Sequence, residues 1–224
     1  DGLRPHRPPL REFWAEFAPS EVITIPHATA PVEGRRFCGN VWTKRDDERR
    51  PLAEVYQAFR DVDSLKELQL RALPGGQRFG FIASSDHLST SGAYAFVWVP
   101  TAGAAESSLD RAPIFEAFRA RRTYGATARI ELEVRSGDQW MGEDPEGDGP
   151  FPIRVPARGA AGISKAEFWG SGSLVHVIAA GGASTPDRSW PLEGAPAAAH
   201  RLLIVRPIQD DGATSWDSAF SLLP

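Results

Sequence analysis

Two histidines and an aspartate stand where short apolar runs of the sequence give way to polar residues. Asp86 and His87 follow the apolar run 81–83, and His27 comes just after the run 22–25. Imidazole nitrogens and carboxylate oxygens are the ligands that zinc, manganese and iron take in proteins. Adjacent side chains of a regular strand point to opposite faces, so Asp86 and His87 can reach one site only if the strand has already turned. The pattern favours a divalent-metal site. The alternative is a turn carboxylate beside an exposed histidine, with His27 a surface or packed side chain.

The elements around these residues alternate between strands and a helix. Residues 81–83 and 94–99 are apolar runs that are typical of strands, and residues 110–122 have apolar side chains at helical spacing. This alternation favours a parallel sheet, in which the carboxyl ends of the strands share one edge. Ligands and catalytic groups collect at that edge in α/β proteins. We therefore expect the three candidate ligands to converge there.

The composition changes near residue 130. Beyond it, short strand patterns alternate with clusters of glycine, proline, aspartate and serine, and no helical period competes with them. The strand candidates are residues 130–134, 153–155, 166–169, 174–178 and 201–206. Short strands at regular spacing favour an antiparallel sandwich. The sequence thus predicts an extended arm and short helix over 1–20, an α/β part over 21–130 and an all-β, sandwich-like domain over 131–224.

Charge and apolar patterning exclude several classes of protein. A net charge of -4 argues against a broad nucleic-acid-binding face. The sequence has no stretch of about 18 apolar residues, and its first residues lack the apolar region of a signal peptide. The single cysteine, Cys38, cannot form an intramolecular disulfide and leaves the compartment open. We expect a soluble protein of the cytoplasm or the periplasm, with no nucleic-acid or membrane partner.

Five motifs lie in order along the chain: IPHATA (25–30), AEVYQAF (53–59), GFIASSDHLST (80–90), IFEAFRARRTYGAT (114–127) and IELEVRSGDQWMGE (130–143). Together they resemble one family. They are similar to the C-terminal half of uncharacterised PHP-like proteins, which are relatives of the polymerase and histidinol phosphatase superfamily of metal-dependent phosphoesterases. The segment 201–220 also resembles the last strands of the β domain that follows the catalytic barrel in that family.

The resemblance implies a fold and a metal site. Residues 21–130 would form the C-terminal half of a β/α barrel, so the expected fold class is α/β, a partial PHP-type barrel followed by an all-β sandwich-like domain. At matching positions the resemblance implies that His27, Asp86 and His87 are ligands of a divalent metal, Zn, Mn or Fe. The family usually spaces its late pair as Asp-x-His, whereas Asp86 and His87 are adjacent.

The resemblance also implies a substrate and shows what this chain lacks. Arg122 and Tyr124 are implied to bind the phosphate of a small phosphorylated substrate, because arginine offers a planar bidentate donor. The superfamily opens with a His-x-His motif and adds further ligands before the strand that matches 21–27, and these are absent here. The ligand set is therefore incomplete. We expect the C-terminal segment of a longer hydrolase, or a diverged copy that has lost the site.

Two functions follow as hypotheses. The first is a PHP-like metal-dependent hydrolase, a phosphoesterase in its full-length form, in which a metal-bound hydroxide attacks a phosphoester. This chain alone should then have little or no activity, even with added Mn²⁺ or Zn²⁺. An open barrel edge would favour association with the missing N-terminal half or with another protein chain. The alternative is a non-catalytic binding or scaffold module that uses the β-sandwich.

Overall fold

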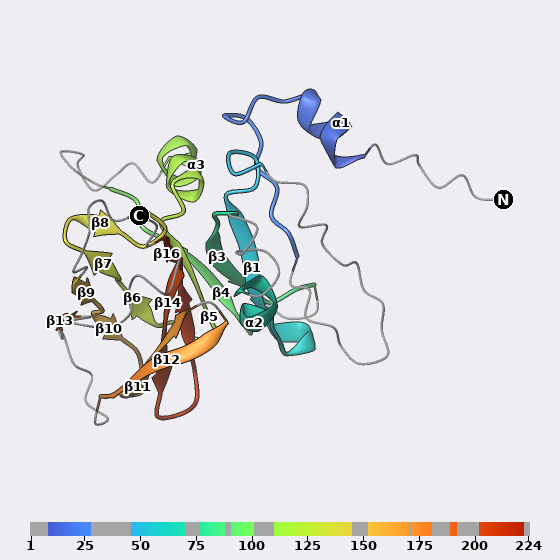
Figure 1. Cartoon of the computed structure of the whole chain (residues 1–224). Coiled ribbons are helices and arrows are strands. Elements are labelled where there is room, and N and C mark those ends of the chain that lie inside the picture. Colours follow the sequence, from blue (N-terminus) through green and yellow to red (C-terminus); the bar gives the residue numbers. More distant parts are fainter. Residues whose placement is uncertain are drawn as a thin grey trace.

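The chain folds mainly into short β-strands (Figure 1). The computed structural model describes residues 9–27, 46–69, 77–87, 91–100, 110–144, 152–170, 172–180, 189–191 and 202–221. Within these residues the α-helices are α1 (Leu10–Ala15), α2 (Leu65–Glu67) and α3 (Arg111–Arg119), and a 3-10 turn, η1 (Ala58–Arg60), follows the first strand. No helix in this described part is both long and apolar enough to cross a membrane.

A parallel pair of strands occupies the first half of the chain. Strand β1 (Leu52–Gln57) lies between β2 (Val62–Asp63) and β3 (Gly80–Ser84), antiparallel to β2 and parallel to β3. Both β1 and β3 are apolar runs, and most of their side chains are buried, as expected for strands covered on both faces. The register of the pair shifts between Glu54 and Tyr56, so β1 contains a β-bulge.

A second sheet packs against β3. Its strands are β4 (Tyr94–Val97), β5 (Thr123–Ala126) and β15 (Ser215–Asp217), in the order β15-β5-β4, and both pairings are antiparallel. There is no room for a side chain between β5 and β3 at Gly125, because a Cβ atom there would lie 2.7 Å from the backbone nitrogen of Ala83. The two sheets therefore approach each other through their backbones at this point.

The remaining described strands form three antiparallel sheets. Strands β12 (Ser173–Ala179), β11 (Ile163–Gly170), β14 (Leu202–Gln209) and β16 (Phe220–Ser221) make one sheet in that order. Strands β13 (Ser189–Pro191), β9 (Pro152–Arg154), β7 (Arg135–Ser136) and β8 (Gln139–Trp140) make the next, and β6 (Glu131–Leu132) pairs with β10 (Ala157–Arg158). After residue 151, the described residues form strands and no helix.

Two hydrophobic clusters hold these sheets together, and β14 contributes to both. One cluster includes Val55, Phe81 and Ile204, and the other includes Leu203 and Val205. Successive side chains of a strand point to opposite faces, so Ile204 packs on one side of β14 and its two neighbours pack on the other. Strand β15, which follows residue 130 in the sequence, also pairs with β5, which precedes it. Residues on both sides of that position therefore share a sheet and a core.

The expectation of an α/β fold with a partial β/α barrel is wrong. Among the described strands only β1 and β3 pair in parallel, and these strands form several small sheets and no barrel. Helix α3 connects β4 to β5, but these two strands are antiparallel to each other. The order of strand, helix and strand indicates a parallel crossover only when the two strands enter one sheet in the same direction. Here β5 lies against the face of β3 instead of extending its sheet, which the absence of a side chain at Gly125 permits.

Candidate functional site

His27 lies beside β1, at the end of a segment that does not form the expected strand. Residues 22–27 are extended but make isolated backbone hydrogen bonds: Thr24 N–H donates to the Arg49 carbonyl at 2.7 Å, and Glu54 N–H donates to the Pro26 carbonyl at 3.0 Å. Pro26 has no N–H of its own to continue a ladder. These bonds fix the chain on either side of Pro26 and so place the histidine next to the carboxylate of Glu54.

The imidazole of His27 contacts two side chains of β1. Its Nδ1 lies 2.8 Å from Glu54 Oε2, and its Nε2 lies 2.9 Å from Gln57 Nε2. The side chain of His27 is 54% exposed, whereas that of Glu54 is only 7% exposed. The arrangement is a buried carboxylate that orients a solvent-accessible histidine.

The β-bulge of β1 brings the two partners of His27 to one face. Glu54 and Gln57 are three positions apart and would point to opposite faces of a regular strand. The register shift between Glu54 and Tyr56 changes that alternation. Ser84, the residue of β3 paired with Gln57, lies on the same face and donates a hydrogen bond from its Oγ to Glu54 Oε1. Glu54 is therefore shared by a histidine and a serine.

The pair Asp86–His87 lies just beyond the end of β3. Asp86 has a φ of 62°, so the strand has already turned, which allows the side chains of Asp86 and His87 to act together. Its Oδ1 accepts the backbone N–H of His87 at 2.6 Å and lies 2.5 Å from His87 Nδ1. The His87 ring also packs 5.3 Å from the ring of Phe59, which follows β1. Ser85 links the end of β3 to the start of β4, because its Oγ donates to the Ala93 carbonyl and accepts from the Ala93 N–H, both at 3.0 Å.

The structure thus places all three sequence-predicted ligands at the carboxyl end of the β1–β3 pair, where His27 is paired with Glu54 and Asp86 is paired with His87. No group of three or more histidine, cysteine, aspartate or glutamate side chains in the described residues is placed to hold a metal ion. Both ring nitrogens of His27 face protein groups. The binding of a divalent metal, Zn, Mn or Fe, by His27, Asp86 and His87 stays a prediction.

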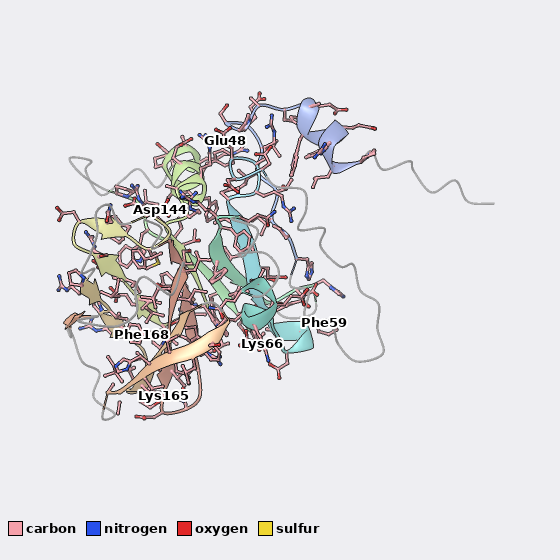
Figure 2. All side chains as sticks on the ribbon, viewed as in Figure 1. Glu48, Phe59, Lys66, Asp144, Lys165 and Phe168 are labelled. Atoms are coloured by element: carbon pink, nitrogen blue, oxygen red, sulfur yellow. The ribbon has the colours of Figure 1, made fainter. Side chains whose placement is uncertain are left out.

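Arg122 lies near the other end of β3, and the hydroxyl of Tyr124 faces Ile130 and Leu132. A Cβ at Gly80, the first residue of β3, would lie 2.7 Å from the Thr123 hydroxyl, whereas the His27 site adjoins Ser84, about 13 Å further along at 3.3 Å per residue. In Figure 2, Phe59, whose ring packs against His87, is labelled apart from Asp144, which follows β8. The structure does not bring Arg122 and Tyr124 to the histidines.

Both of these residues have protein partners. Arg122 is paired with Glu143, with its Nη2 at 2.9 Å from Oε1. Tyr124 is 3% exposed, and its hydroxyl donates to the Ile130 carbonyl at 3.0 Å and accepts from Leu132 N–H at 3.2 Å. Burial raises the pKa of Tyr124 to about 12, although the Leu132 bond opposes this. Binding of a substrate phosphate by these two residues stays a prediction.

Three residues of the site were missed at the level of sequence: Glu54, Gln57 and Ser84. The signal that could have found Glu54 is a carboxylate inside the buried run Leu52–Gln57, where an ionisable side chain needs a partner. Gln57 and Ser84 gave no such signal, because the face of the sheet to which their side chains point depends on the bulge and on the pairing of β1 with β3.

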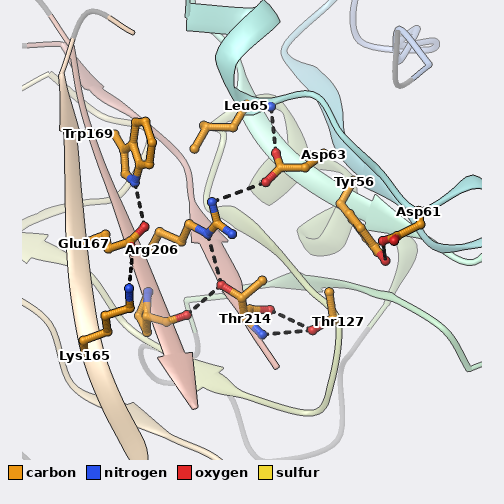
Figure 3. Close-up of polar contacts among 11 residues, drawn as sticks. Tyr56, Asp61, Asp63, Leu65, Thr127, Lys165, Glu167, Trp169, Arg206 and Thr214 are labelled. Atoms are coloured by element: carbon orange, nitrogen blue, oxygen red, sulfur yellow. Dashed lines mark hydrogen bonds and ion pairs between the residues drawn. The ribbon is translucent and has the colours of Figure 1, made fainter. Parts of the chain in front are cut away.

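A second polar cluster connects β1 and β2 to the C-terminal sheet (Figure 3). Arg206 of β14 lies 3.4 Å from Asp63 Oδ2, and its Nε donates to Thr214 Oγ1 at 3.4 Å. Burial raises the pKa of Asp63, although a backbone N–H and Arg206 oppose this. For Glu167, burial would raise the pKa, but hydrogen bonds from Lys165 and Trp169 outweigh it and the pKa is lowered. In this cluster Arg206 is paired with Asp63, and Lys165 is paired with Glu167. The cluster is therefore a junction between sheets rather than a reactive site.

Comparison with known proteins adds no family to this geometry. No protein-family model, no curated protein and no solved structure matches the chain.

Proposed function

We propose that the chain carries the acid–base site of a hydrolase, with His27 as the proton-transfer residue and a phosphoester as the substrate class. The observation that supports this is the 2.8 Å contact between Nδ1 of a half-exposed His27 and the buried carboxylate of Glu54. A carboxylate in that position favours the tautomer with hydrogen on Nδ1 and leaves Nε2 able to accept a proton. The substrate class rests on the resemblance of the sequence motifs alone.

The surroundings of His27 suit proton transfer to and from a water molecule. In hydrolysis, Nε2 accepts a proton from the attacking water and returns it to the leaving oxygen. Gln57 holds Nε2 at 2.9 Å, and it is the group that the water displaces. Ser84 holds the other oxygen of Glu54 and keeps the carboxylate from rotating away. Asp86–His87 supplies a second histidine–carboxylate pair at the same edge.

The test is hydrolysis of an aryl phosphate and of an aryl carboxylate ester by the chain and its variants. The metal-dependent hypothesis predicts little or no activity for this chain alone. The acid–base proposal instead predicts slow turnover of the phosphate, within the range of about 10²–10⁴-fold that positioned acid–base groups contribute. His27→Gln should abolish it, and Glu54→Gln should reduce it because the imidazole loses its orienting partner. His176→Gln, on strand β12, is the matched control and should have no effect. Turnover that is unchanged in His27→Gln, or absent from the unmodified chain, would overturn the proposal.

A second candidate function, binding of a further strand, is favoured by strand β12. This strand pairs with β11 and with no other described strand, so its outer edge is unpaired among the residues that the structure describes. Its seven residues, SLVHVIA, include no lysine, arginine, aspartate or glutamate, and Leu174 and Val177 are 46% and 43% exposed. Open edges normally carry charges that prevent pairing with another chain. We infer that β12 pairs with β12 of a second copy of this chain.

Sedimentation of the chain over a roughly hundredfold range of concentration tests this second function. We expect a dimer that forms as the concentration rises, and Val177→Lys should shift the chain to a monomer by placing a charge at the edge. Lys165→Gln, a change on β11, is the control. A chain that is monomeric throughout, or a dimer insensitive to Val177→Lys, would rule out pairing through β12.

A further inference from the structure

A small polar pocket lies at the opposite end of β3 from His27. Its lining comes from five segments that are far apart in sequence: Arg78 and Phe79 before β3, Arg121 after α3, Gly142 and Asp144 after β8, Leu202 of β14, and Ala219 before β16. The pocket therefore gathers two guanidinium groups and one carboxylate against apolar side chains. It lies beside the neighbouring pair Arg122–Glu143, but neither of these residues lines it.

The backbone holds Arg121 in an unusual conformation toward this pocket. Its φ is 61°, in the left-handed region that residues other than glycine rarely adopt and that is enriched at functional sites. Its Nε donates a hydrogen bond to the Gly142 carbonyl at 2.8 Å. Gly142 has a φ of 82°, and a Cβ there would lie 2.3 Å from the Arg121 carbonyl oxygen. Only glycine allows this approach, so the contact positions the guanidinium group.

The terminal nitrogens of Arg121 have no partner within the described part of the chain. The neighbouring arginines differ, because Arg78 is paired with Asp144 and Arg122 with Glu143. Burial lowers the pKa of Arg121 and Arg78 adds to that change, whereas Asp144, Asp47 and Glu143 oppose it. Carboxylates thus lie near the guanidinium group, but its two terminal nitrogens remain able to donate.

We propose that Arg121, together with Arg78, binds an oxyanion in this pocket: a carboxylate or phosphate group that presents two oxygen atoms to the guanidinium of Arg121. Arginine matches such a pair of oxygens with two parallel hydrogen bonds. Two positive charges and one negative charge line the pocket, and Asp47 and Glu143 also act on Arg121, so the bidentate geometry of the guanidinium group rather than a surplus of positive charge carries this proposal. The pocket is separated from His27 by the length of β3, so this inference does not depend on the proposed hydrolase function.

NMR titration of the chain with inorganic phosphate and, separately, with sodium acetate tests the proposal. The signals to follow are the Arg121 side-chain Nε–H and the Gly142 backbone amide, with ionic strength held constant by chloride. We expect a saturable shift with at least one of the two anions, with a dissociation constant on the order of 1 mM. Saturation with phosphate alone would assign a phosphate site, and saturation with acetate alone a carboxylate site.

Variants separate a built site from general attraction of anions. Arg121→Gln should weaken binding by at least about tenfold. Arg121→Lys should weaken it less, because lysine keeps the positive charge but cannot donate the two parallel hydrogen bonds of a guanidinium group. Arg119→Gln, in which the changed residue is paired with Glu116 on α3, is the matched control and should bind as the unmodified chain does. If Arg121→Gln does not fold, Arg78→Gln carries the comparison. No saturable shift with either anion, or equal weakening in Arg119→Gln, would overturn the proposal.

Discussion

Asp217 shows how tightly the centre of this protein constrains a single ionisable side chain. It is 0% exposed, and its Oδ1 accepts a hydrogen bond from Val205 N–H at 2.6 Å. Its Oδ2 has no partner within the described residues. Burial raises the pKa of Asp217 well above its usual value of 3.8, and the Val205 bond only partly opposes this. The neutral carboxylic acid is therefore the form that the folded chain prefers.

Replacing this carboxyl group should change how stability depends on pH. The folded state keeps the proton of Asp217 to a higher pH than the unfolded state, so the unfolded state binds fewer protons and this group's contribution to stability falls as pH rises above about 4. The loss can reach about 1.4 kcal/mol per pH unit until the folded-state pKa is passed. Asp217→Asn cannot ionise, so its stability relative to the unmodified chain should improve as pH rises.

Urea unfolding at pH 4.5 and at pH 7.5 measures this difference, with both pH values chosen to lie above the ordinary pKa of about 3.9. Asp210→Asn, a change at an exposed turn position, is the control and should show a difference that does not vary with pH. If the free energy of unfolding of Asp217→Asn differs from that of the unmodified chain by the same amount at both pH values, the pKa of Asp217 is not raised in the folded state.

At the scale of elements, the contact between β3 and β5 determines how the two sheets of the first half lie. A Cβ at Gly125 would lie 2.7 Å from Ala83 N, 2.8 Å from Ile82 C and 2.9 Å from Ala83 Cβ. Two of these three atoms belong to the backbone, so they cannot move aside as the end of a flexible side chain could. The absence of one side chain thus allows β5 to cover β3.

Gly125→Ala should therefore destabilise the chain more than an alanine at an open glycine. We expect a loss of about 1–3 kcal/mol in the free energy of unfolding, the range typical of overpacking. Gly137→Ala is the control: a Cβ there meets no atom within 4 Å, and the φ of 60° adds only backbone strain of about 1 kcal/mol. Urea unfolding of both variants gives the comparison. An equal or smaller loss for Gly125→Ala would show that the sheets can separate at little cost.

At the scale of the whole molecule, β15 and its Trp216 connect the N-terminal sheets with the C-terminal strands. Trp216 is 1% exposed, its ring stacks 5.3 Å from the ring of Tyr56, and Arg206 lies over it at 5.5 Å. Its backbone meanwhile pairs with Gly125 in β5. A residue that contacts β1, β5 and β14 together should make their unfolding cooperative.

Trp216→Ala should lower the free energy of unfolding by about 3–5 kcal/mol, as large-to-small changes of buried aromatic residues do. The unmodified chain should unfold in a single transition, so that far-ultraviolet circular dichroism and tryptophan fluorescence give the same midpoint. Trp140→Phe, at a half-buried position on β8, is the control and should cost less than about 1.5 kcal/mol. Two separate transitions in the unmodified chain would show that its halves fold independently.

The sequence by itself determined many of the local elements and the positions of three site residues along them. Helix α3 and strands β3, β9, β11 and β12 occur where apolar periodicity predicted them, because their buried faces depend on side chains near one another in the chain. For the same reason His27 and Asp86–His87 were recognised as polar residues that follow apolar runs.

Only the tertiary structure decided which strands pair, in which direction, and what faces the histidines. The antiparallel pairing of β4 with β5 and of β5 with β15 depends on hydrogen bonds between distant segments and on the close approach at Gly125. The partners of His27 depend on a bulge that turns Glu54 and Gln57 to one face. Local periodicity carries no information on such contacts, because the same run of residues can pair in either direction and a bulge shifts the facing of every residue after it.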